Sequence, residues 1–174
     1  MSKKNQQMKV GFFIVVIAVS ICLLFTIIYF QLFSSEFVMP VKGANRSSYS
    51  QKSFWAYPWG ESGHHKGVDI FAKRGTPVVS STHGVVIFTG VLKRGGNAIL
   101  ILGPKMKMYY YAHLDSILIQ NYSVVKAGDT IGKVGNTGNA KTKPYHLHFS
   151  IRSVFLFRQG GYQNPTPLLN NSIL

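Results

Sequence analysis

Five of the six histidines fall into three groups along the chain: His64 and His65, then His113, then His146 and His148. The last pair stands in the segment HLHF, where alternating apolar residues predict a β-strand. Residues two apart on a strand project from the same face, so these two imidazoles are expected to share one pocket. Crowded neutral imidazoles gain little from each other, whereas a divalent cation turns the same arrangement into ligation.

The first group adds a carboxylate. In HHKGVDIF, His65 stands four residues before Asp69, with Gly67 between them and a strand-like run following. The glycine favours a turn that enters a strand and lets the two side chains converge. Asp69 lies between two β-branched residues, where an unpaired carboxylate would be costly. Lys66 could neutralise it as a plain surface ion pair, but a metal that also binds His65 accounts for more of the local sequence.

Together, His65, Asp69 and one histidine of the HLH pair would give three protein ligands and leave one tetrahedral position open for water. With nitrogen and carboxylate donors and no thiolate at hand, one Zn²⁺ ion is the best match, although this donor set also suits other divalent ions. Zinc lowers the pKa of a bound water to about 7 and polarises a carbonyl, and amide hydrolysis uses both effects. The pattern therefore predicts a hydrolytic metal enzyme.

Three segments, HHKGVDI, YYYAHL and YHLHFSI, resemble the H-x-G-x-D, Y-x-H-L and H-L-H-F motifs of the lysostaphin and LytM-type zinc endopeptidases, in the same order. Three separated motifs in the correct order are a specific signal. The resemblance covers about residues 54 to 169. It implies that His65, Asp69 and His148 are the zinc ligands. His113 and His146 then form a catalytic pair, in which one imidazole takes a proton from water and the other stabilises the oxyanion or assists the leaving amine.

The resemblance also implies a substrate, the peptides of bacterial peptidoglycan, and a mainly antiparallel β fold with a groove over the metal. Two departures from the usual pattern leave the substrate-binding residues unassigned. NAKTKPY precedes the last motif instead of a small Ser-Thr-Gly-Pro type loop, and Ser150 follows it instead of an acidic residue. His64 and His83 have no matching role and are expected at the surface. Without the other motifs, His113 would be interpreted as an ordinary core histidine flanked by aromatic residues.

The elements that would position these residues are strands. From residue 54 onward, short β-branched and aromatic runs recur between Gly, Pro, Asn or Asp: VDIF, PVVSS, GVVIFTG, NAILILG, KMYYYAHL, DTIGKVG and HLHFSI. We therefore predict an all-β, mainly antiparallel domain over 54–174, sandwich-like or barrel-like with a zinc groove. Residues 34–53, rich in Ser, Gly and Pro, are predicted to form a linker. The tail NPTPLLNNSIL is expected to pack as an irregular strap.

An uncharged apolar run over residues 10–33, about 24 residues long, follows a short basic tail over residues 1–9. As a helix it would cover a hydrocarbon layer of about 30 Å, so we predict a transmembrane segment. The positive-inside rule then leaves the N-terminus cytoplasmic and places the domain outside the bacterial cell (inner) membrane. A cleavable signal peptide is the alternative, although this run exceeds the usual core of 7–15 residues. The only cysteine, Cys22, lies within the run, which excludes a disulfide in the domain.

The net charge of +14 predicts an anionic partner or a solvated basic surface. For an exported domain, wall polymers or anionic lipids are more plausible than nucleic acid, and we expect no nucleic-acid partner. The sequence therefore favours a zinc endopeptidase that hydrolyses peptide cross-links or bridges of peptidoglycan. The alternative is a non-catalytic peptidoglycan-binding or regulatory module that activates another wall hydrolase. The presence of all five motif residues favours the enzyme.

Overall fold

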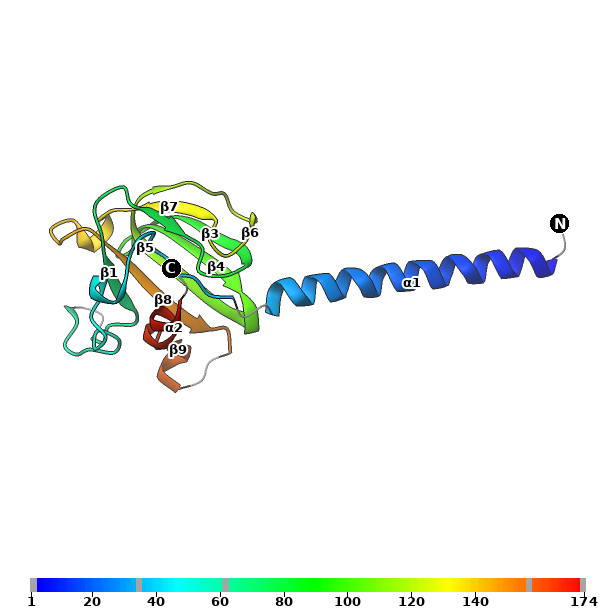
Figure 1. Cartoon of the computed structure of the whole chain (residues 1–174), viewed down its shortest axis with the longest axis horizontal. Helices are drawn as coiled ribbons and strands as arrows, with labels where there is room; N and C mark the ends of the chain where they lie inside the picture. Colours follow the sequence, from blue (N-terminus) through cyan, green and yellow to red (C-terminus); the bar gives the residue numbers. More distant parts are fainter. Residues whose placement is uncertain (1–2, 34–35, 61–62, 156–157, 173–174) are drawn as a thin grey trace.

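A computed structural model describes residues 3–33, 36–60, 63–155 and 158–172 of the chain (Figure 1). It contains one long helix, α1 (Lys3–Phe33), that projects from a β domain. The predicted transmembrane segment over 10–33 falls on α1, where the side chains at 10, 26–27 and 29–33 lie outside the described ones. In the part of the chain that the structure describes, no helix is long and apolar enough to cross a membrane, so the predicted transmembrane helix is not supported.

The β domain is built on one sheet in which every pair of strands is antiparallel. Its strands are β1 (Val68–Phe71), β2 (Pro77–Val79), β3 (Gly84–Leu92), β4 (Gly96–Gly103), β5 (Lys107–Ile117), β6 (Val124–Val125), β7 (Thr130–Val134), β8 (His146–Ser153) and β9 (Tyr162–Gln163). The main strand order is β1-β8-β5-β4-β3-β6. β7 pairs with β2 and with the end of β5, and β9 pairs with β8. The predicted mainly antiparallel β fold is confirmed, but the sheet is open, in place of the predicted sandwich-like or barrel-like form.

Short helical turns lie before and between the strands: η1 (Arg46–Ser48) precedes β1, and η3 (Pro104–Met106), η4 (Gly138–Ala140) and η5 (Arg158–Gly161) connect later strands. The tail, predicted to be an irregular strap, instead forms the helix α2 (Thr166–Asn171). Prolines are tolerated in a first helical turn because its N–H groups have no intrahelical partner. Leu169 of α2 is buried, and the hydroxyl of Tyr49 donates a hydrogen bond of 2.8 Å to Oδ1 of Asn170.

Residues 36–53, the described part of the segment predicted to be a linker, place four side chains in the core of the domain. Met39, Val41, Ala44 and Tyr49 belong to the hydrophobic core. Isolated bridges pair Val41 with β2 and Tyr49 with β1. A segment rich in small polar residues thus contributes a few well-spaced apolar side chains, and full burial of one such as Val41 stabilises the fold by roughly 1.5–3 kcal/mol. Residues 34–35 lie outside the described residues.

The core lies on one face of β8 and the histidines lie on the other. Leu147, Phe149 and Ile151 are buried in the core, and the residues between them in sequence, His146, His148 and Ser150, line a pocket. This is the period-two alternation of a strand. The apolar face of β8 therefore fixes the direction of its polar face.

Candidate active site

Strand pairing sets the positions of the polar residues on the floor of the site. Asp69 of β1 lies directly opposite His148 of β8, and Phe71 lies opposite His146. At Gly67, just before β1, a Cβ atom would lie 2.4 Å from the carbonyl oxygen of Phe149 and 2.9 Å from the His148 ring. Only glycine allows the chain to approach β8 so closely, which is what the glycine of the HHKGVDI segment does here.

His65 is held from three sides before the chain enters β1. Its backbone N–H donates a hydrogen bond of 3.0 Å to the carbonyl of Ala56, and its own carbonyl accepts one of 2.7 Å from Trp55. Its Nδ1–H donates to the carbonyl of Ser53 at 2.9 Å. The ring of Trp59 stacks on the imidazole with the centroids 4.0 Å apart. The lone pair on Nε2 of this buried histidine therefore has a fixed position and direction.

Three ligand atoms converge on one point. Nε2 of His65 lies 3.1 Å from Oδ1 of Asp69 and 3.1 Å from Nδ1 of His148, and these last two atoms lie 2.8 Å apart. Because Nδ1 of His65 carries its proton, Nε2 faces the other two atoms as an acceptor. Ligands bound tetrahedrally at about 2.0–2.2 Å from a zinc ion lie about 3.4 Å apart, close to this spacing. A divalent cation would satisfy all three atoms at once, so the residues present fit a zinc ion.

The charge on Asp69 supports the same arrangement. Burial alone would raise the pKa of this carboxyl, but the contacts with His148 and His65 outweigh burial and hold the pKa well below its usual range. Asp69 is therefore ionised at neutral pH and available as a ligand.

His113 stands where β5 changes partner. β5 pairs with β8 as far as Ala112 and with β7 from Leu114 onward, and its pairing with β4 shifts register between Tyr111 and Leu114, around His113. His113 adopts φ 63°, in the left-handed region, and its N–H donates a hydrogen bond of 2.7 Å to the carbonyl of Gly95. A regular strand would turn this side chain toward the core, beside Tyr111. The irregularity turns it into the pocket instead.

His146 completes the polar wall. Its Nδ1–H donates to the carbonyl of Pro144 at 2.7 Å, and Nδ1–H of His113 donates to the carbonyl of Thr137 at 2.9 Å. Both rings therefore keep Nε2 as a lone pair, and their centroids lie 5.1 Å apart. Nε2 of His146 lies 3.9 Å from Oδ2 of Asp69. Two imidazoles with fixed tautomers thus stand beside the cluster of ligand atoms.

All five residues singled out from the sequence line one pocket of about 270 Å³. They are His65, Asp69, His113, His146 and His148. Within the described residues, the group suited to hold a metal consists of His65, Asp69 and His148. A pocket that joins a carboxylate, two ligand imidazoles and two further imidazoles is suited to water activation and proton transfer.

Residues 63–165 match Peptidase family M23. The chain belongs to this family. The catalytic domain of lysostaphin from Staphylococcus simulans has the same fold, with a TM-score of 0.62 and 33% sequence identity. The match covers 68% of this chain and 90% of that domain.

Two curated M23 relatives carry names that differ in function. The L-Ala--D-Glu endopeptidase of Bacillus subtilis is 36% identical over 115 residues, which are 61% of this chain and 35% of that protein. The murein hydrolase activator NlpD of Escherichia coli is 37% identical over 91 residues, 52% of this chain and 23% of that protein. The chain thus spans about a third or less of the length of these relatives.

The M23 pocket also contains residues that the sequence did not single out. Trp59, Arg94, Tyr110 and Tyr162 line it together with the histidines. The aromatic-rich run FWAYPW just before the first motif contains Trp59, and the segment YYYAHL contains Tyr110, whereas no sequence pattern marked Arg94 or Tyr162. His64 and His83, expected at the surface, are half-buried: the ring of His64 stacks on Trp55 with the centroids 5.1 Å apart, and Nε2 of His83 lies 2.9 Å from a carboxylate oxygen of Glu36.

The pKa of His113 gives a stability prediction. Burial, followed by the nearby His148 and His146, lowers this pKa from 6.5 to about 4. The unfolded chain therefore binds this proton at a higher pH than the folded chain, so stability falls as the pH drops from about 6.5 to about 4. We expect a loss of about 2–3 kcal/mol over this interval in chelator-treated protein, measured by urea unfolding.

The matched variant is His113→Gln, which cannot titrate. Its unfolding free energy should change less over the same pH interval. Parallel curves for the two proteins would contradict the assigned pKa shift.

Proposed function

We propose that this M23 domain is a zinc-dependent endopeptidase that hydrolyses peptide cross-links or bridges of bacterial peptidoglycan. The observation that carries the proposal is the convergence of Nε2 of His65, Oδ1 of Asp69 and Nδ1 of His148, whose spacings are 2.8–3.1 Å. These three residues would hold the zinc ion. When bound, the ion supplies Lewis-acid polarisation of the scissile carbonyl and acidifies a water molecule.

The two remaining histidines are suited to move protons. Burial keeps His113 neutral at pH 7, and its Nδ1–H is committed to the carbonyl of Thr137. Its Nε2 can therefore accept a proton from the attacking water. His146 faces the same space from β8, where its Nε2 can carry a proton to the developing oxyanion or to the leaving amine. The backbone carbonyls that bind both Nδ1 atoms keep these rings oriented through the reaction.

The direct test is digestion of purified peptidoglycan by the 174-residue chain, followed by mass analysis of the released fragments. We expect new amino and carboxyl termini within the peptides, loss of this activity after chelation and recovery after addition of zinc. Release of glycan fragments with intact peptides would contradict the proposed bond class.

A second candidate function is activation of another wall hydrolase without catalysis, because the chain is similar to NlpD. The complete set of five residues supports the enzyme instead. In cells, His113→Ala should behave like a null allele if the domain is an enzyme. Normal wall remodelling by that variant, together with purified protein that contains no zinc, would favour the activator.

The names of the relatives also suggest a location. Outer membrane antigenic lipoprotein B of Histophilus somni is among the proteins that this chain resembles. We propose that this chain likewise resides in the bacterial cell envelope, and a single-pass anchor over 10–33 stays a prediction from the sequence. Recovery of the chain in the cytosolic fraction after cell lysis would contradict an envelope location.

A further inference from the structure

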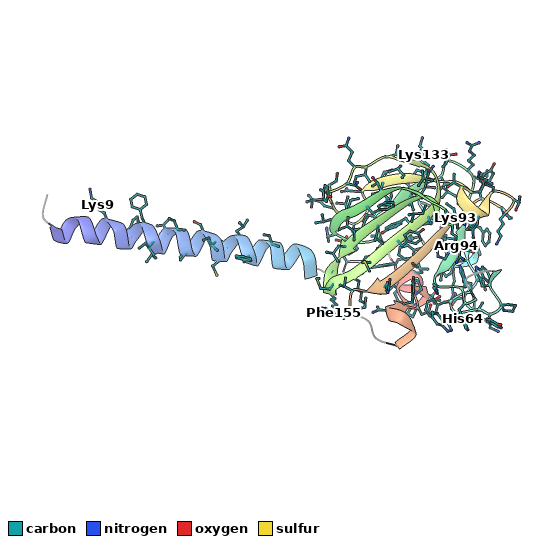
Figure 2. All side chains as sticks on the ribbon, turned by 180° about the vertical axis from the view of Figure 1, so that it is seen from behind. Lys9, His64, Lys93, Arg94, Lys133 and Phe155 are labelled. Carbon is teal, nitrogen blue, oxygen red and sulfur yellow. The ribbon has the colours of Figure 1, made fainter. Side chains whose placement is uncertain are left out.

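The end of the β domain from which α1 leaves carries an exposed patch that the proposed function does not use. The turn η3, which lies next to α1, and the two residues after β8 form this patch. Met106, Val154 and Phe155 expose 40%, 39% and 58% of their surface. Figure 2 shows Phe155 beside the end of α1. We call this surface the basal patch, and its residues are Lys105, Met106, Lys107, Val154 and Phe155.

Backbone contacts hold the two parts of the basal patch together. Lys105 and Met106 adopt φ 57° and 52°, in the left-handed region that few side chains favour. The carbonyl of Met106 accepts a hydrogen bond of 2.9 Å from N–H of Val154, and the carbonyl of Pro104 accepts one from N–H of Lys107. The turn is therefore fixed to the end of β8, and it exposes Lys105 and Met106 to solvent.

Two ammonium groups lie close together in the basal patch. Lys105 and Lys107 both line a small hollow of about 80 Å³. Burial, and then the charge of Lys105, lowers the pKa of Lys107, so the two cations repel each other. The acid among the described lining residues of this hollow, Glu36, lies 2.9 Å from Nε2 of His83. An anion placed over both lysines would relieve their repulsion.

The mixture of apolar and cationic side chains favours a bilayer surface over a soluble anion. A soluble polyanion would contact the lysines and leave Met106 and Phe155 in water. At a lipid surface, apolar side chains enter the boundary between headgroups and acyl chains, while lysines contact anionic headgroups. α1 carries further exposed apolar side chains, including Phe13, Leu24 and Phe25. Apolar surface thus lies on both sides of the junction between α1 and the domain.

We propose that the basal patch docks on a bilayer surface that contains anionic phospholipids. The proposal goes beyond the endopeptidase function, rests on the proposed location in the cell envelope, and does not require α1 to span the bilayer. At about 3.3 Å per residue, β8 extends about 17 Å from His148 to Ser153, next to the basal patch. In Figure 2, His64, the neighbour of the ligand His65, lies on the side of the domain opposite Phe155. Docking would therefore hold the metal-ligand pocket away from the lipid.

The test places an environment-sensitive dye on the basal patch of the full chain. Cys22→Ser removes the only cysteine, and Phe155→Cys supplies the labelling site. The labelled chain is reconstituted with phosphatidylcholine vesicles, with or without phosphatidylglycerol, that contain nitroxide-labelled lipid. In the anionic vesicles we expect dye emission at shorter wavelength and stronger quenching by the nitroxide. A dye at Val91→Cys, a residue that is 79% exposed near the far end of β3, should show neither change.

The lysines are tested in the same labelled chain. In anionic vesicles, Lys105→Gln/Lys107→Gln should lower the ratio of docked to undocked protein roughly tenfold, because two cations no longer meet the charged surface. The control is Lys93→Gln/Lys133→Gln, which removes the same charge from exposed residues outside the basal patch. Figure 2 shows both control residues away from Phe155. The control should dock as the unsubstituted chain does.

Equal quenching in neutral and anionic vesicles, or an equal loss in the control, would overturn the proposal. A dye at position 155 that stays fully accessible to aqueous iodide would also overturn it, because a patch that binds only soluble anions leaves the dye in water. The assay contains no peptidoglycan, so its result is separate from the endopeptidase function. A chain that cleaves no peptide can still dock, and an active chain can fail to dock.

Discussion

Replacing His148 by alanine should remove bound zinc and reduce peptidoglycan hydrolysis more than about a hundredfold. Nδ1 of His148 lies 2.8 Å from Oδ1 of Asp69 and 3.1 Å from Nε2 of His65. The substitution therefore removes one of the three ligand atoms. Two protein ligands would remain, too few for a stable catalytic zinc site. Metal content of the purified protein and hydrolysis rate are measured on the same sample.

His146→Ala is the matched variant, because it removes an imidazole from the same face of the same strand. It should keep the metal and lose turnover, since Nε2 of His146 lies 3.9 Å from Oδ2 of Asp69, beyond the tight cluster of ligand atoms. Loss of metal in both variants would place His146 among the ligands. Retention of metal by His148→Ala would contradict the proposed ligand set.

Replacing His113 by asparagine should abolish most activity and stabilise the metal-free domain. Removal of a general base lowers rates by about 10²–10⁴-fold. His113 adopts φ 63°, a region that asparagine occupies more readily than histidine, and such a backbone costs of order 1–3 kcal/mol. We expect a gain of about 1 kcal/mol in the free energy of unfolding, since the hydrogen bond to Thr137 is also changed.

His113→Gln serves as the comparison, because glutamine has no preference for the left-handed region. It should lose activity to a similar degree without the gain in stability. Unfolding by urea at pH 8 keeps the histidine neutral and separates the backbone effect from titration. Wild-type turnover by either variant would remove His113 from the proton-transfer pair.

The strands could be predicted because short β-branched and aromatic runs recur between Gly, Pro, Asn or Asp. Seven runs expected to form strands each contain one, from β1 to β5 and in β7 and β8. β6 and β9 were missed, since two residues each are too few to give a period. The packing of Met39 and Val41 was missed because a segment of small polar residues looks like a linker. A short helix in the proline-rich tail was missed for a similar reason.

The arrangement of the site residues could be predicted only in part from the sequence. The spacing of His146 and His148 predicts a shared face, because both stand on a regular strand. The orientation of His113 could not be predicted, since a regular β5 would have sent it into the core with Tyr111. It depends on an irregular register between β4 and β5 and on the distant carbonyls of Gly95 and Thr137.

The most direct test is anomalous X-ray scattering at the zinc absorption edge from crystals grown with zinc. We predict one peak about 2.0–2.2 Å from Nε2 of His65, from a carboxylate oxygen of Asp69 and from Nδ1 of His148. A map without a peak among these three side chains, in protein that still hydrolyses peptidoglycan, would contradict it.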